Sequence, residues 1–435
     1  MNPCMLSVTE AADAIAARRV SSVELVQACL DRIDERDSDV RAWAYIDRQA
    51  ALEEAHLRDR ESPIGPLHGV PVGVKDVIDT RDLPSEYGSP IYRGYRPGRE
   101  AACVSLARRA GAVILGKTVT TEFALYQPGK TANPHSVRHT PGGSSSGSAA
   151  AVADFQVPVA FGTQTSGSII RPAAFCGAVG YKPSFGTFSL DGVKPLAQSL
   201  DTLGYITRNV RDLLIMRSAL LGAARFPSLF VHEKPRVGFY RTPFWSAASS
   251  ETRQLLEQTA NRLAENGFGV EDVASPPSFN SLNELHARLM AFETARNYVP
   301  EYDLSNRSLL GERTRQVIED GWNISADDYQ AMRSELWLAR QTFFEVAQNF
   351  DVLMVPAAVG EAPPIESTGD PMFSRMWSLL GVPAITIPAQ IGPNGLPLGI
   401  QFVAAYDNDL RLLQVCQRIE ELFGQSARTA CAVSD

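Results

Sequence analysis

The sequence predicts an α/β fold, in which helices cover a β-sheet. Two observations favour it. Short apolar segments rich in valine and isoleucine alternate with runs whose apolar residues recur at helical spacing, along most of the 435 residues. No internal repeat or low-complexity linker separates these segments, so we expect one domain with a helical elaboration.

Residues 1–60 are predicted to be helical. "SVTE" from Ser7 and "SSVE" from Ser21 each place a glutamate three residues after a serine. This is the spacing of a capping box, in which the two side chains satisfy free backbone N–H groups at a helix start. Apolar residues then recur at helical spacing from Val23 to Ile33.

Residues 65–223 are predicted to form a core in which strands and helices alternate. "GVPVGVKDVID" from Gly69 is apolar and β-branched, which favours a buried strand. "AACVSLARRAGAVILGKT" from Ala101 predicts a helix that stops at Gly111, followed by a short strand. "FQVPVAFGTQT" from Phe155 predicts another strand that runs into a loop.

Residues 224–350 are predicted to be a mainly helical elaboration that covers a pocket. "RVGFY" from Arg236 resembles a strand, and the helical runs lie around 251–267, 281–299 and 327–350. Residues 351–435 then return to strands in "DVLMVP", "AITIPAQI" and "LGIQFVAA". The amphipathic run "DLRLLQVCQRIEELFG" predicts a closing helix.

The composition excludes several classes of function. A hydrophobic content of 44%, a charged content of 21% and a net charge of −8 give no basic surface for nucleic acid or an anionic membrane. No apolar run approaches the ~18 residues that span a bilayer, and no secretion signal is evident at the N-terminus. The six cysteines form no CxxC pair, which gives no support to a zinc or redox site. We therefore expect a cytoplasmic protein that contacts neither nucleic acid nor membrane.

Two motif matches are set aside. "GAVILGKT" from Gly111 fits the P-loop pattern, but its intervening residues favour a strand over a phosphate-binding loop. "GSSSG" around Ser145 fits the hydrolase elbow GxSxG, yet a polar segment precedes it where the elbow needs a strand. Only His232 and His286 follow as candidate bases, in regions predicted to be surface or cover helix. A Ser-His-Asp triad is therefore disfavoured.

A different serine chemistry is indicated by "GTQTSGSIIRPAAFCGAVGYKPSFG" from Gly162. A strand that runs into a turn of small residues aims several backbone N–H groups at one point, as an oxyanion hole requires, with Ser168 at its lip. A serine nucleophile needs a base. Lys75 on its buried strand is a candidate, because desolvation lowers the pKa of a lysine. The alternative is that Lys75 reaches solvent or pairs with Asp76.

Three motifs together resemble the amidase signature family. They are "GVPVGVKD" at 69–76, "PGGSSSGSAAAVA" at 141–153 and "GTQTSGSIIRPAAFCGAVGYKPS" at 162–184, and the resemblance extends over about residues 5–425. It implies a single amidase domain, at 1–435, with a large, mixed, twisted sheet covered on both faces by helices.

The resemblance also implies a Ser–cis-Ser–Lys triad. Ser168, which follows Ser144 by 24 residues, maps to the nucleophile, Ser144 to the bridging serine and Lys75 to the base. The peptide bond before Ser144 is expected to be cis. The implied oxyanion hole is made by the amides of Thr165, Ser166 and Gly167, and the acyl-enzyme mechanism needs no metal or organic cofactor. Ser145 and Ser148 are expected to be structural hydrogen-bonding residues.

The chain departs from the usual family pattern at a few positions. The departures within the motifs are Gln164, Ser146, Ser166 and an extra isoleucine before Arg171. Many members carry aspartate where this chain has Gln164, which disfavours the glutaminase (A-type) subunit of a tRNA-dependent amidotransferase.

The apolar character of the predicted pocket favours a neutral, partly hydrophobic small amide, anilide or carbamate as substrate. The pocket candidates are Tyr126, Phe373, Met376 and Trp377, each of which also fits ordinary core packing. Three alternatives stay open: a urea- or biuret-type hydrolase, a non-catalytic scaffold and the glutaminase subunit. We expect a monomer or a homodimer.

Overall fold

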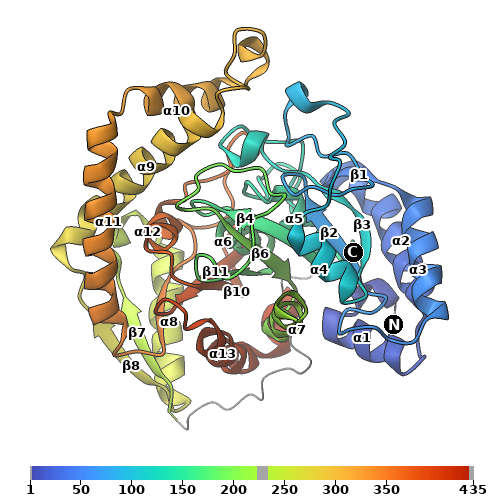
Figure 1. The fold of residues 1–435 in the computed structure, drawn as a ribbon. Helices are drawn as coiled ribbons and strands as arrows, with labels where there is room; N and C mark the ends of the chain where they lie inside the picture. The colour runs from blue at the N-terminus through green and yellow to red at the C-terminus, as the bar shows by residue number, and fades with distance from the viewer. Residues whose placement is uncertain (1, 223–233, 431–435) are drawn as a thin grey trace.

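A single mixed sheet runs through the centre of the protein. The computed structural model describes residues 2–222 and 234–430. Within them, eleven strands lie in the order β1-β3-β2-β4-β6-β5-β10-β11-β9-β7-β8 (Figure 1). The predicted α/β class, the single domain and the large mixed sheet are confirmed.

The strands come from all parts of the chain. β2 lies parallel to both β3 and β4, β7 lies parallel to both β8 and β9, and the other neighbours are antiparallel. Their bounds are β1 (Trp43–Ile46), β2 (Pro71–Lys75), β3 (Val113–Thr118), β4 (Val159–Gln164), β5 (Val179–Lys182), β6 (Thr202–Thr207), β7 (Arg236–Tyr240), β8 (Gly269–Val273), β9 (Val352–Pro356), β10 (Ala384–Ile391) and β11 (Pro397–Val403).

Helices pack around this sheet. The α-helices of the described ranges are α1 (Val8–Ala16), α2 (Ser22–Val40), α3 (Arg48–Arg60), α4 (Ala102–Arg109), α5 (Ser146–Ala153), α6 (Ile170–Cys176), α7 (Val210–Leu221), α8 (Ser250–Glu265), α9 (Leu282–Asn297), α10 (Glu312–Trp322), α11 (Ala326–Ala347), α12 (Met372–Leu380) and α13 (Asp409–Ala430). Short 3₁₀ turns lie at Pro3–Met5, Pro90–Tyr92, Glu122–Ala124, Trp245–Ala247, Pro277–Ser281 and Arg307–Leu309. In the described part of the chain, none of the helices is both long and apolar enough to cross a bilayer.

The N-terminal region follows its predicted caps and adds one strand. The capping boxes at Ser7 and Ser21 both form, and α1 and α2 begin at the next residue. The expectation of helices alone over residues 1–60 is wrong at β1. There "WAYI" pairs antiparallel with β3, and the aromatic and β-branched residues of this segment suit a strand.

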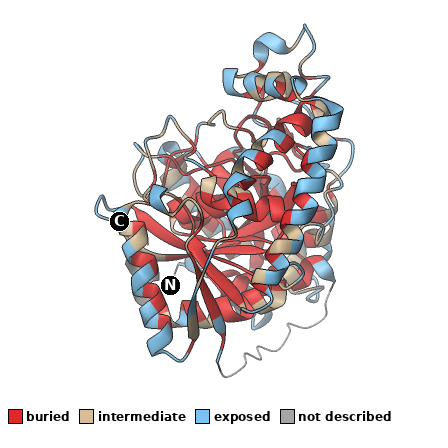
Figure 2. Ribbon diagram, turned by 90° about the vertical axis from the view of Figure 1, so that its left-hand side faces the viewer, coloured by how far each residue is buried: buried red, intermediate tan, exposed pale blue. Residues whose placement is uncertain are grey.

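The central strands are buried on both faces. Every residue of β2, β3 and β4 is buried, as expected where helices cover both sides of a sheet. Figure 2 shows the buried strands inside and the exposed residues on the outer sides of the helices. The hydrophobic core has one large cluster around these strands and a second one beneath α9, α11 and α12.

The segment 224–350 has two structural roles. Strands β7 and β8 extend the sheet, and α8 packs on β8 and β9. Helices α9, α10 and α11 form a helical layer, in which α9 contacts α10 and α11 and also α12 of the following segment (Figure 1). The predicted boundary at 223/224 and His232 lie outside the described residues.

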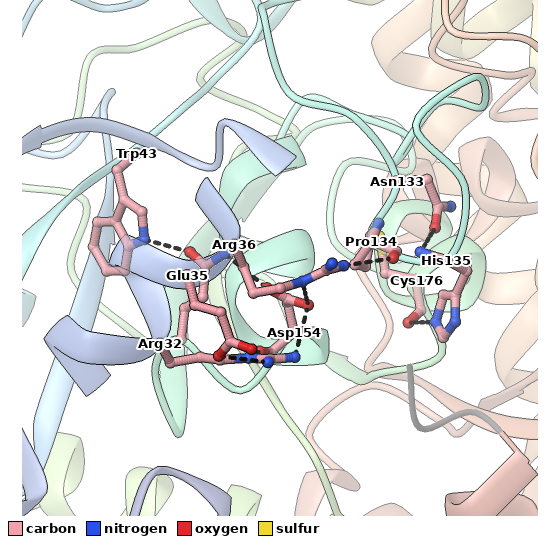
Figure 3. Close-up of polar contacts among 10 residues, drawn as sticks. Arg32, Glu35, Arg36, Trp43, Asn133, Pro134, His135, Asp154 and Cys176 are labelled. Carbon is pink, nitrogen blue, oxygen red and sulfur yellow. Dashed lines mark hydrogen bonds and ion pairs between the residues drawn. The ribbon is translucent and has the colours of Figure 1, made fainter. Parts of the chain in front are cut away.

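A buried polar cluster fastens the end of α5 to the N-terminal helices (Figure 3). The Asp154 carboxylate accepts hydrogen bonds from Arg32 and Arg36, at 3.3 and 3.1 Å. The Arg36 guanidinium also donates to the carbonyl of Pro134, in the loop that leads to the Gly/Ser segment. The cluster therefore ties to α2 the residues on either side of the glycine- and serine-rich segment 142–148.

Candidate active site

Lys75 and the turn after β4 meet because β2 and β4 are parallel neighbours. The carboxyl ends of parallel strands lie at one edge of the sheet, where α/β proteins place their sites. β2 ends at Lys75 and β4 ends at Gln164. Lys75 Nζ lies 2.7 Å from Ser144 Oγ and 2.8 Å from Thr163 Oγ1.

Lys75 is fully buried, and among the described residues it forms no ion pair with a carboxylate. Burial holds the pKa of Lys75 well below its usual value of 10.5, and the charge of Asp201 only partly opposes this. Desolvation penalises the ammonium form, so the neutral amine is favoured relative to an exposed lysine.

Asp76 pairs with Lys117 and not with Lys75. Lys117 Nζ lies 2.9 Å from the Asp76 carboxylate and also donates to Ser85 Oγ at 2.6 Å. Neighbouring residues of a strand point to opposite faces of the sheet, which separates Lys75 from Asp76. The alternative of a Lys75–Asp76 ion pair is therefore wrong. Lys117, the lysine of the P-loop match, lies in β3 as the strand prediction required.

Ser144 is held by its backbone on both sides. The Gly143–Ser144 peptide bond is cis, as the resemblance implied. The carbonyl of Gly143 accepts a hydrogen bond from Arg171 Nη2 at 2.7 Å, and that of Ser144 accepts one from Thr121 N at 3.2 Å. The preceding Gly142 has a φ of +82°, a conformation that glycine adopts without steric cost.

The neighbouring serines make structural hydrogen bonds, as expected. Ser145 Oγ donates to the carbonyl of Thr163 at 3.3 Å, and Ser148 Oγ donates to that of Phe161 at 2.8 Å. Ser146 Oγ donates to the carbonyl of Val119 at 3.3 Å. Each of these hydroxyls is therefore occupied in fastening α5 to the sheet.

In the turn at residues 165–168, the carbonyls are hydrogen-bonded and three of the backbone N–H groups are not, within the described residues. Within the described ranges, the backbone N–H groups of Ser166, Gly167 and Ser168 donate to no protein acceptor. The carbonyls do have partners: His286 Nε2 for Thr165, Ser378 Oγ for Ser166, Arg171 N for Gly167 and Ser145 N for Ser168. Free backbone N–H groups on one turn are the donors that an oxyanion hole requires.

The backbone of Ser168 contacts Ser145, the residue that follows Ser144. Ser145 N donates to the Ser168 carbonyl at 3.2 Å, which brings the two segments together. Among the residues that the structure describes, the Ser168 hydroxyl has no hydrogen-bond partner. The structure thus forms the Lys75–Ser144 contact of the predicted triad, and the expected hydrogen bond between Ser144 and Ser168 is not formed.

Gln164 stabilises the turn with both ends of its amide. Gln164 Oε1 accepts from the N–H groups of Ile169 and Ile170, at 2.8 and 3.0 Å, where α6 begins. Gln164 Nε2 donates to Ser378 Oγ at 3.1 Å. The two isoleucines before Arg171 are both fully buried, so the extra residue fills the core beneath the turn.

Three further residues border the turn that motif reasoning did not assign. Arg171 is buried, and burial lowers its pKa to about 10. Asp201 accepts from Thr165 Oγ1 at 2.6 Å, and burial raises its pKa to about 6. His286, expected on the surface or in a cover helix, lies in α9 but is fully buried. The available sequence signal was a histidine between Leu285 and Leu289 on an apolar helix face.

The predicted pocket residues divide into two groups. Phe373, Met376 and Trp377 are buried in the core, where the Trp377 ring packs edge-on against aromatic neighbours. Packing therefore accounts for their apolar character. Tyr126 is only partly buried. No group of three or more His, Cys, Asp or Glu side chains in the described part of the chain is arranged to hold a metal ion.

Comparison with known proteins places this site in a large set of relatives. The family described as Amidase matches residues 24–413. The A-type subunit of the glutamyl-tRNA(Gln) amidotransferase of Nostoc sp. is 30% identical, over 96% of this chain and 98% of its own length. A crystal structure of an amidase superposes with a TM-score of 0.88 and 30% identity, over 96% of this chain and 99% of the other. The peptide amidase of Stenotrophomonas maltophilia superposes with a TM-score of 0.84 and 28% identity, over 98% and 97%.

Proposed function

This chain belongs to the amidase family, and from that membership we propose that it hydrolyses a neutral, partly hydrophobic small amide, anilide or carbamate. The reaction proceeds through an acyl intermediate on Ser168. The main support is the buried contact of 2.7 Å between Lys75 and Ser144, beside a turn with free N–H groups.

The proposed mechanism transfers two protons, each between neighbouring members of a chain of three side chains. Neutral Lys75 accepts the proton of Ser144, Ser144 accepts the proton of Ser168, and Ser168 Oγ attacks the substrate carbonyl carbon. The N–H groups of Ser166 and Gly167 stabilise the oxyanion, together with Thr165 in the predicted set. The proton returns along the same chain to the leaving nitrogen as the C–N bond breaks. Water then adds to the acyl-enzyme and releases the acid.

The carboxylates around the turn give no support to a cationic substrate. Asp201 accepts three hydrogen bonds from protein donors, and the neighbouring Glu293 accepts from Ser199 N and Tyr329. These carboxylates are therefore not available to a cationic substrate. Arg171 donates to two backbone carbonyls, and its buried Nη1 has no hydrogen-bond partner within the described residues. The substrate test must therefore include an amide that carries a carboxylate.

A second candidate function is the glutaminase subunit of an amidotransferase. The observation in its favour is that curated relatives at 30–32% identity, aligned over most of this chain, carry that name. Such a subunit should act on glutamine, and we expect its activity to depend on a partner chain.

A substrate panel tests the proposal. The purified chain is incubated alone with aryl amides, anilides, carbamates, peptide amides, short aliphatic amides, biuret, glutamine and a carboxylate-bearing amide. We expect turnover of a hydrophobic anilide or carbamate by the native chain and none by Ser168→Ala, with unchanged circular dichroism. A sulfonyl fluoride should label Ser168, located by peptide mass mapping.

Three results would change the assignment. Near-normal turnover by Ser168→Ala would remove the nucleophile and revive the scaffold alternative. Labelling at Ser145 would support the elbow motif instead. Hydrolysis of glutamine that appears only when a second protein is added would establish the amidotransferase function.

A further inference from the structure

We infer that His286 and Ser378 are positioning residues for the oxyanion hole. They donate hydrogen bonds to the carbonyls of two consecutive peptides, on the side opposite to the N–H groups that would bind the oxyanion. The inference rests on the proposed function. Neither residue belongs to the three sequence motifs, and they lie on different helices, α9 and α12.

Peptide geometry links each carbonyl to an N–H group. In a trans peptide the C=O and N–H bonds lie in one plane and point in opposite directions. The Thr165–Ser166 peptide carries the carbonyl that His286 Nε2 contacts at 2.9 Å and the N–H of Ser166. The Ser166–Gly167 peptide carries the carbonyl that Ser378 Oγ contacts at 2.7 Å and the N–H of Gly167. Fixing the two carbonyls therefore fixes the direction of the two N–H groups.

His286 can only donate in this contact. A carbonyl oxygen accepts and never donates, so Nε2 carries the proton of the imidazole. Burial lowers the pKa of His286 to about 4, which keeps the ring neutral near pH 7. Nδ1 is then an acceptor, and within the described ranges it is buried without a partner. The side chain therefore makes a single directional bond, and that bond goes to the turn.

Ser378 is oriented by Gln164. Gln164 Nε2 donates to Ser378 Oγ at 3.1 Å, and Ser378 in turn donates its only proton to the Ser166 carbonyl. Hydrogen bonds in such a buried chain strengthen one another. An aspartate at position 164 has no N–H to start this chain. The glutamine that departs from the usual family pattern is thereby matched to a serine on α12.

The bond from Ser378 is specific to its position on the helix. Ser374 lies one turn earlier on α12 and is equally buried, but its hydroxyl has no partner among the described residues. It provides a matched control, because Ser374→Ala and Ser378→Ala remove the same atom from the same helix.

Kinetics of four variants test the inference. His286→Phe and Ser378→Ala should each lower kcat about ten- to hundred-fold. Direct loss of an oxyanion-hole donor lowers kcat by about 10²–10³-fold, so the expected effect is smaller. KM should change by less than about threefold. His286→Gln places an amide N–H near the position of Nε2 and should recover most of the loss. Ser374→Ala should stay within about twofold of the native chain. Binding of a trifluoromethyl ketone should weaken in parallel with kcat/KM, since this inhibitor forms a tetrahedral oxyanion.

A double-mutant cycle adds a readout for the Gln164–Ser378 chain. Gln164→Glu keeps an oxygen for α6 but loses the N–H that orients Ser378. Because the two side chains act in series, Gln164→Glu combined with Ser378→Ala should be no slower than the worse single variant.

The possible outcomes separate this inference from the proposed function. If Ser168→Ala is inactive while His286→Phe and Ser378→Ala keep native kcat, the inference fails and the nucleophile stands. If His286→Gln is as slow as His286→Phe, or if KM rises while kcat holds, the residues are structural and the inference fails as well. Activity in Ser168→Ala would instead overturn the proposed function.

Discussion

At the scale of single residues, the main feature is a lysine that the fold buries beside hydroxyls. Lys75 Nζ contacts Ser144 and Thr163. The carboxylate of Asp76, the next residue in the sequence, forms an ion pair with Lys117 instead. Removing water without supplying a counter-ion is what lowers the pKa of an amine. The pairing of Asp76 with Lys117 therefore leaves Lys75 without a direct counter-ion among the described residues.

The activity should increase with pH as Lys75 loses its proton. Below its lowered pKa the ammonium cannot accept a proton from Ser144, and above it the neutral amine can. Lys75→Arg should lose at least about 10³-fold in kcat, because guanidinium stays protonated. The pH profile of kcat/KM between pH 5 and 10 is the measurement.

Lys182 supplies the control for this profile. It is fully buried in β5, and burial lowers its pKa to about 7, but among the described residues its amine donates only to the carbonyl of Pro183. Lys182→Met should therefore keep the native profile. A profile that moves in Lys182→Met, or a Lys75→Arg enzyme that keeps most of its rate, would assign the ionisation elsewhere.

At the scale of elements, α5 owes its position to a close approach between backbones. Gly147 lies in its first turn, and a Cβ there would stand 2.1 Å from the carbonyl oxygen of Ala42 and 2.4 Å from Val119 N. Because Ser144 lies only two residues before this helix, any shift of α5 also shifts the bridging serine.

Gly147→Ala should therefore lower stability and activity together. The methyl group meets backbone atoms that cannot rotate away, so we expect a loss of at least about 1–3 kcal/mol in the free energy of unfolding. Urea denaturation measures this loss. Gly98→Ala is the control, because a Cβ at Gly98 meets nothing within 4 Å. Equal stability of the two variants would show that α5 can move without cost.

At the scale of the whole molecule, the cysteines report on the integrity of the fold. Cys4, Cys29, Cys103, Cys176 and Cys416 are all buried free thiols. Burial raises their pKa values, for example to about 12 for Cys29. Thiolate formation and access are both required for reaction with a thiol reagent.

The native protein should accordingly protect these five thiols. In a Cys431→Ser variant, which removes the cysteine outside the described residues, Ellman's reagent should detect few thiols in buffer and five in denaturant. Treatment of the native protein should leave hydrolysis unchanged, because the proposed nucleophile is a serine. Rapid reaction of several thiols in buffer would contradict the buried placement.

Features that depend on local pattern could be predicted from the amino-acid sequence. The capping serines Ser7 and Ser21 started their helices, the strand of Lys75 was recognisable from its β-branched run, and the three motifs identified the family. These signals are local, because a helix cap or a strand needs only residues within a few positions.

The contacts between residues that are distant in the sequence could not be predicted in this way. His286 and Ser378 contact carbonyls of the turn that lie 121 and 212 residues away in the sequence. Asp76 forms its ion pair with Lys117 and not with the adjacent Lys75. Met376 and Trp377 lie in the hydrophobic core because α12 packs against α9 and α11. Such contacts depend on the order and direction of the strands and on helix packing. No spacing within one segment encodes them.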